Sequence, residues 1–117
     1  MSFVFDQALF NDEEIEVLSI DGGKRIAAAL GNKKFCILRN HGLLTAAESV
    51  EGAVARFVLA ERVAEVHVKA GAAARPISEA GAKQTALEYE NANVGWHAFQ
   101  YLVRDVVPDP GVVEPCG

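Results

Sequence analysis

The longest regular pattern of apolar and polar positions covers residues 50–70. Apolar side chains recur there every three or four residues, as on one face of a helix about 30 Å long. Ser49 is a suitable N-cap and Gly71 interrupts the pattern, so the sequence predicts a helix with Phe57 on its buried face. The positions on that face are Val50, Ala53, Val54, Phe57, Glu61, Ala64 and Val68.

Two short apolar runs on either side of a polar turn predict a pair of strands. Residues 35–38 form the first run, residues 43–46 form the second, and Asn40-His41-Gly42 lies between them. Folds often display functional side chains on polar, glycine-containing turns of this kind. The turn is therefore the first candidate site.

The pattern before this hairpin is weaker. Partial alternation over residues 14–20 favours a strand. Asp21 is a suitable N-cap for a short helix over residues 24–30, which Gly31 would end.

After residue 70 the pattern predicts two helices and a tail. Ser78 precedes a predicted helix over residues 79–91, and the apolar spacing over residues 96–106 predicts an amphipathic helix. Three prolines predict an extended tail over residues 107–117. No repeat is visible, so residues 1–117 are expected to form a single domain or part of one.

Composition and charge narrow the classes of function. The chain is 50% hydrophobic and 23% charged, as in globular proteins. Its net charge is −5 and its longest cationic cluster is Lys33-Lys34, so we expect no nucleic-acid partner and no membrane surface. Two cysteines, no signal peptide and no apolar run of about 20 residues favour a cytoplasmic protein with free thiols.

Four segments occur in a characteristic order: GKRIAAALG over 23–31, ILRNHGLLT over 37–45, SVEGA over 49–53 and AERVA over 60–64. Their order and gaps resemble the carboxyl-terminal half of a class II aldolase/adducin domain. Trp96 to Gln100 resembles the tail helix of fungal members, which look closest. The resemblance covers most of the chain after about Asp6.

This resemblance implies both a fold and a chemistry. The fold would be α/β, part of a three-layer α/β/α domain with a small, mainly antiparallel sheet and long helices, assembled into homo-oligomers. Family enzymes hold a divalent metal, commonly zinc, through three histidines. They act as lyases on small carbonyl or sugar-phosphate-like substrates. Two of the histidines come from a His-x-His segment, and the third comes from the Asn-His-Gly segment, here His41.

The sequence departs from the family at the metal site. Its three histidines are His41, His67 and His97, and it contains no His-x-His. Catalytic zinc needs about three protein ligands, so we expect His41 to be a metal ligand only in a completed site. This chain alone is expected to bind zinc weakly or not at all. It would be a partial domain, either naturally half-length or truncated.

Four residues are the candidates for catalysis. His41 is an acid/base, or a polar residue inherited with the fold. Asn40 orients His41, or only satisfies the turn, and Arg39 binds a carboxylate or phosphate, or makes a surface ion pair. Tyr101 is an acid sent into a neighbouring subunit, as in some family members, or an interface residue.

Three functions remain open. The first is an aldolase-like, metal-dependent lyase that needs a second polypeptide or a missing segment to complete its site. The second is a metal-independent isomerase, cyclase or decarboxylase acting on a small biosynthetic intermediate. The third is a non-catalytic, adducin-like assembly module. Fold alone does not choose among them.

We predict that the chain is not a monomer. Half of a domain exposes sheet edges and apolar helix faces, and association covers both. Sedimentation at micromolar concentration is expected to show a homo-oligomer. A single species of 12.5 kDa would contradict this expectation.

Overall fold

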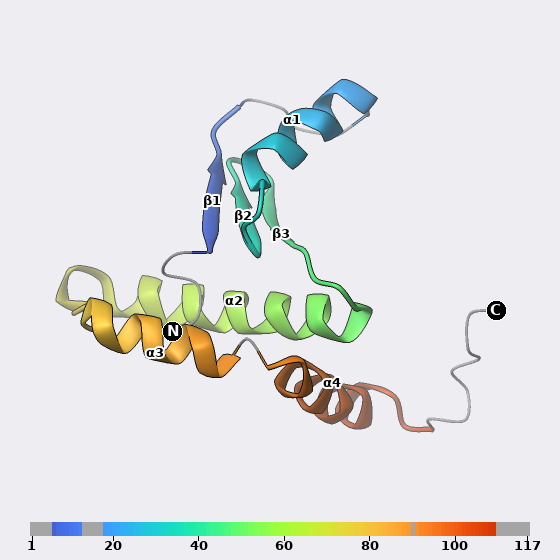
Figure 1. The fold of residues 1–117 in the computed structure, drawn as a ribbon, viewed down its shortest axis with the longest axis vertical. Helices are drawn as coiled ribbons and strands as arrows, with labels where there is room; N and C mark the ends of the chain where they lie inside the picture. The colour runs from blue at the N-terminus through green and yellow to red at the C-terminus, as the bar shows by residue number, and fades with distance from the viewer. Residues whose placement is uncertain (1–5, 13–17, 90, 110–117) are drawn as a thin grey trace.

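The chain forms a small sheet with helices packed on both of its faces (Figure 1). The computed structural model describes residues 6–12, 18–89 and 91–109. The described elements confirm the predicted α/β class, and none of their helices is long and apolar enough to cross a membrane. In order they are β1 (Gln7–Phe10), α1 (Ile20–Leu30), β2 (Phe35–Leu38), β3 (Gly42–Thr45), α2 (Val50–Ala70), a 3-10 turn (Gly71–Ala73), α3 (Glu79–Tyr89) and α4 (Ala92–Val106).

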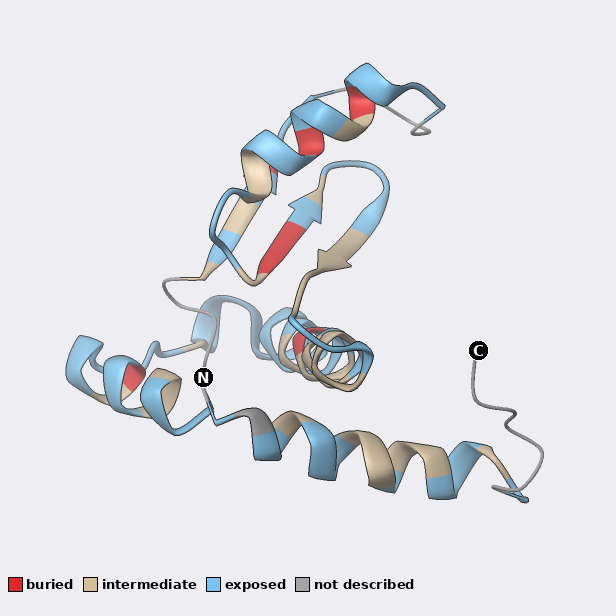
Figure 2. Cartoon of the chain, turned by 45° about the vertical axis from the view of Figure 1, so that its right-hand side comes forward, coloured by how far each residue is buried: buried red, intermediate tan, exposed pale blue. Residues whose placement is uncertain are grey.

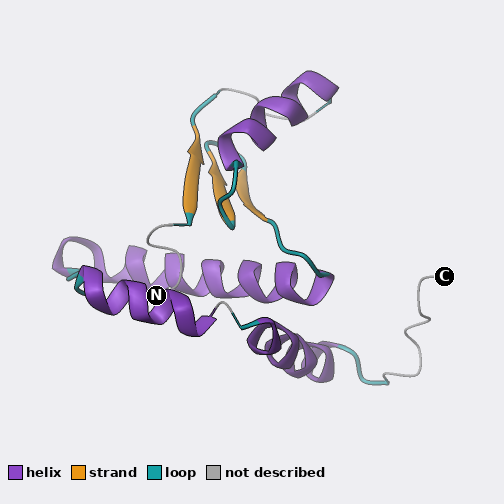
Figure 3. Cartoon of the chain, viewed as in Figure 1, coloured by secondary structure: helices purple, strands orange, loops and turns teal. Residues whose placement is uncertain are grey.

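The central strand of the sheet is β2 (Figure 3). It pairs in parallel with β1, where Gln7 lies opposite Phe35, and antiparallel with β3, where Phe35 lies opposite Thr45. The described sheet is therefore mixed, with one parallel and one antiparallel pairing. The first strand of the hairpin has the predicted bounds and the second begins one residue earlier than predicted, at Gly42, whereas β1 was not predicted.

The strand predicted over residues 14–20 is not found where the structure describes that segment. Residues 13–17 lie outside the described residues, and Ile20 already begins α1. Ser19, rather than Asp21, is the N-cap, because its Oγ accepts a hydrogen bond from the Gly22 amide at 3.0 Å. The helix ends as predicted at Gly31, whose φ of 51° suits glycine.

Successive side chains of β2 point to opposite faces of the sheet, and each face has its own apolar cluster. Cys36 is 0% exposed and packs with Phe10 and Ile26 beneath α1. Phe35 points to the opposite face and packs against Ala60 of α2. Figure 2 shows buried positions on α1, β2 and α2. The helix α1, the sheet and α2 thus form the three layers that the family fold implies.

The helix α2 has the bounds that the sequence predicts. The Ser49 Oγ accepts a hydrogen bond from the Gly52 amide at 3.1 Å, and Gly71 ends the helix. The predicted buried face was wrong in part, because Phe57 is 41% exposed and Glu61 is exposed, whereas Ala60 is 3% exposed. Strands of four residues cover only a short part of a 21-residue helix, which explains the difference.

The last helix, α4, starts four residues before the predicted segment and crosses α2 (Figures 1 and 2). The backbones of the two helices lie close together at Gly52 and Gly95, where a Cβ added to Gly95 would lie 3.3 Å from the Gly52 Cα. Only a residue without a side chain fits such an approach comfortably. Of the predicted tail over residues 107–117, the structure describes only 107–109, so an extended tail stays a prediction.

We expect Gly95→Leu to lower the free energy of unfolding by roughly 1–3 kcal/mol, because the added side chain overpacks the helix crossing. Urea unfolding followed by circular dichroism measures this change. Gly23→Ala is the matched control: nothing lies within 4 Å of the added Cβ, so the change should stabilise α1 by roughly 0.5–1 kcal/mol. A Gly95→Leu variant as stable as the wild type would show that the crossing is loose.

Candidate functional site

The turn between β2 and β3 holds three of the four predicted catalytic residues. Asn40 has a φ of 65°, the left-handed conformation that asparagine tolerates better than most residues. The His41 amide donates to the Leu38 carbonyl at 3.0 Å, and Gly42 follows with a φ of 148°. This conformation lets Asn40 form the turn and leaves its proposed role in orienting His41 a prediction. The side chain of His41 is exposed at the end of the sheet.

Arg39 fixes this turn to the neighbouring strand. Its amide donates to the Phe10 carbonyl at 3.0 Å, and its Nη1 donates to the Asn11 Oδ1 at 2.7 Å. The second contact joins the guanidinium to a side-chain amide. The guanidinium keeps further N–H groups that can bind a carboxylate or phosphate.

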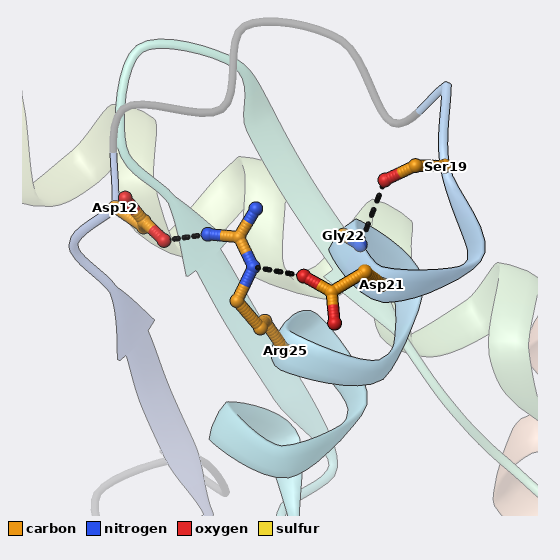
Figure 4. A network of polar contacts seen from close by, with 5 residues as sticks. All are labelled: Asp12, Ser19, Asp21, Gly22 and Arg25. Atoms are coloured by element: carbon orange, nitrogen blue, oxygen red, sulfur yellow. Dashed lines mark hydrogen bonds and ion pairs between the residues drawn. The ribbon is translucent and has the colours of Figure 1, made fainter.

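A second set of polar residues lies at the same end of the strands (Figure 4). Asp12 follows β1 and forms an ion pair with Arg25 of α1, which also pairs with Asp21 through its Nε at 3.3 Å. The parallel pairing of β1 and β2 brings Asn11 and Asp12 beside the turn. Neither residue was predicted from the sequence, although Asn11-Asp12 directly follows the apolar run of residues 8–10.

Tyr101 does not join the turn within this chain. It lies on α4, 68% exposed, with the Arg104 guanidinium 5.9 Å from its ring centroid. The other two histidines are also apart from His41: His67 is exposed on α2, and the ring of His97 packs edge-on against Trp96 at 5.0 Å. The structure therefore brings Arg39, Asn40 and His41 together and leaves Tyr101 elsewhere.

A metal site is not formed by the described part of the chain. No three His, Cys, Asp or Glu residues are grouped there in a way that could hold an ion. His41 is one ligand, and a catalytic zinc site needs about three. Cys36 does not add a ligand to the turn, because burial raises the pKa of its thiol and keeps it protonated.

Comparison with protein families identifies the lineage of this fold. The model of the class II aldolase and adducin N-terminal domain matches residues 3–68, which is more than half of the chain. The chain therefore belongs to the class II aldolase and adducin family. Members of this family usually use a divalent metal.

Two curated relatives match almost the whole chain. The decarboxylase NovR of Streptomyces niveus is 34% identical over 97% of this chain and 44% of its own length. The 4-hydroxy-3-prenylphenylpyruvate oxygenase/4-hydroxy-3-prenylbenzoate synthase of Streptomyces roseochromogenus subsp. oscitans is 35% identical over 97% of this chain and 43% of its own length. The chain thus spans less than half the length of either relative.

A solved structure supports the same family assignment as the two relatives. The L-fuculose 1-phosphate aldolase from Glaciozyma antarctica PI12 has a TM-score of 0.65 and 34% identity to this chain, and the match covers 89% of this chain and 42% of that one. The predicted family, the aldolase-like fold and the partial coverage are confirmed. The assignment to a carboxyl-terminal half, and the roles of the four site residues, stay predictions.

We expect His41→Ala to leave the free energy of unfolding within about 0.5 kcal/mol of the wild type, because an exposed side chain makes few contacts. Urea unfolding checks this expectation. The zinc content of the wild-type chain, measured by mass spectrometry after dialysis, should stay well below one ion per chain. One tightly bound zinc per chain would mean either that further ligands lie outside the described residues or that subunits share a site. Unfolding of the variant would make His41 a structural residue.

Proposed function

We propose that this chain forms part of a class II aldolase-type enzyme that breaks a carbon–carbon bond beside a carbonyl group. Its substrate would be a small molecule in the cytoplasm. Aldol cleavage and the decarboxylation of a 3-oxo acid share this requirement, since each leaves an electron pair on the carbon next to a carbonyl group, which accepts the pair as an enolate. A decarboxylase among the relatives and an aldolase among the solved structures support this common chemistry.

The observation that carries the proposal is the exposed turn at the end of β2. His41 follows a left-handed Asn40 and stands free of the core, so its imidazole is available to a substrate. Histidine is the side chain best suited to proton transfer near neutral pH. Arg39 lies beside it, held by Asn11, and supplies a cation for a carboxylate or phosphate group.

The rest of the site would come from outside the described residues. Leu9 and Ile37 are cross-strand partners on the sheet face that Phe35 shares, yet they are 60% and 41% exposed. This uncovered apolar area supports a covering polypeptide, either another segment or another copy. In a homo-oligomer, Tyr101 of one copy would be free to approach His41 of another.

The described residues do not fit the metal that the family usually uses. We therefore assign no step of the reaction to a metal here. The roles proposed for His41, Arg39 and Tyr101 are proton transfer and anion binding, which these side chains supply themselves.

The test is a comparison of two substrate panels, run on this chain and on any longer natural polypeptide that contains it. Aromatic 3-oxo acids report decarboxylation by release of carbon dioxide, and ketose 1-phosphates report aldol cleavage by release of a triose phosphate. Activity on one panel is expected, and His41→Gln should lower kcat by about 10²–10⁴-fold. Lys69→Gln, on the exposed surface of α2, is the control that should retain full activity.

A lack of turnover on both panels, with and without added divalent metal, would contradict the proposal. The adducin-like assembly function would then be favoured. The uncovered Leu9 and Ile37 and the incomplete set of metal ligands among the described residues are compatible with that alternative.

A further inference from the structure

A separate concave surface lies at the opposite end of β2 from His41. Lys34 directly precedes β2 and lines this surface, whereas Arg39 and His41 follow the strand and do not. The cavity has a volume of about 840 Å³ and lies between α2 and α4. Cavities that hold small molecules usually measure about 300–1,000 Å³, so this one has a suitable size.

The shape of the cavity follows from the crossing of the two helices. They touch at Gly52 and Gly95, and both glycines line the cavity. Ala55 lies one turn after Gly52, and Ala98 lies one turn after Gly95, so small side chains keep the floor open. Leu59 and Leu102 add apolar walls farther from the contact. The interior is therefore suited to a flat apolar body.

The charged residues of the lining favour an anion. Four cations and two acids line the cavity, although the whole chain has a net charge of −5. Lys34 is paired with Asp6 at 3.0 Å, and the Arg56 guanidinium is held by the Ala46 carbonyl. Arg62 is exposed and makes no hydrogen bond or ion pair within the described part of the chain. The lining thus offers one unoccupied guanidinium and the remaining N–H groups of Arg56. The acids in the lining are Glu48 and Asp105.

The amino-terminal ends of both helices also lie at the cavity. Ser49 and Asn91 are the N-caps of α2 and α4, and both line the cavity. The amino-terminal end of a helix carries partial positive charge. The first turn of α4 contains no acidic residue that would neutralise this charge, whereas the first turn of α2 contains Glu51.

We propose that this cavity binds a small amphiphilic anion, meaning an apolar ring system that carries one carboxylate or sulfonate group. The ring lies over Ala55 and Ala98, and the anionic group pairs with Arg62. This site is distinct from the His41 turn and does not depend on the proposed reaction.

The test uses two fluorescent probes that differ in charge. The anionic probe is 8-anilino-1-naphthalenesulfonate, and the neutral probe is N-phenyl-1-naphthylamine, which has the same rings without the sulfonate. Titration of the whole chain is expected to show tighter binding of the anionic probe. Arg62→Gln should weaken that binding by roughly tenfold, the effect of losing about 1.4 kcal/mol, and should leave the neutral probe unchanged.

Two further variants test whether the probes bind in the cavity. Lys69→Gln removes the same charge from α2 outside the cavity and should change neither affinity. Ala98→Leu fills the cavity and should weaken both probes. Circular dichroism checks the fold of each variant, and if Ala98→Leu does not fold, the exposed Arg62→Gln decides the result.

Two outcomes would overturn the proposal. Equal affinity for the two probes, with no effect of Arg62→Gln, would show that no anion is recognised. Loss of the anionic probe in Leu9→Ser would place it on the uncovered sheet face instead of the cavity.

Discussion

The burial of β2 on both faces is the constraint on which the rest of this structure depends. This strand has only four residues, yet it is bonded to a strand on either side and packed beneath a helix on each face. Cys36 and Phe35 point in opposite directions and hold α1 and α2 in place. Because β2 is anchored in this way, the residues at its two ends are also fixed. One end presents His41, and the other contributes Lys34 to the cavity.

Much of this fold could be predicted from local sequence, and the errors have physical reasons. The helix over residues 50–70 and the strand over residues 35–38 have strong periodicity or clear boundaries, and both were predicted with their observed bounds. The strand β1 was not predicted because its formation depends on pairing with β2, which lies about 28 residues later in the chain. Burial of Phe57 was predicted from helical spacing alone, which does not report how far a short sheet extends.

In the candidate site, too, features set by neighbouring residues could be predicted from the sequence, and features set by tertiary contacts could not. The Asn40-His41-Gly42 turn could be found from sequence because its residue types and neighbours are local. The hydrogen bond from Arg39 to Asn11 could not, because it depends on the parallel pairing of β1 and β2. The separation of Tyr101 from His41 within one chain likewise follows from how α4 crosses α2, which no motif in the sequence reports.

The crossing of α2 and α4 at two glycines also has a mechanical consequence. At Gly52 and Gly95 the two backbones lie close because neither residue has a Cβ. From Gly95 to the end of α4 the lever is about 16 Å long, at 1.5 Å per residue. A rotation of about 10° about the contact would therefore move the far end of α4 by roughly 3 Å. Any change in the crossing angle would therefore alter the width of the space between the two helices beyond this contact.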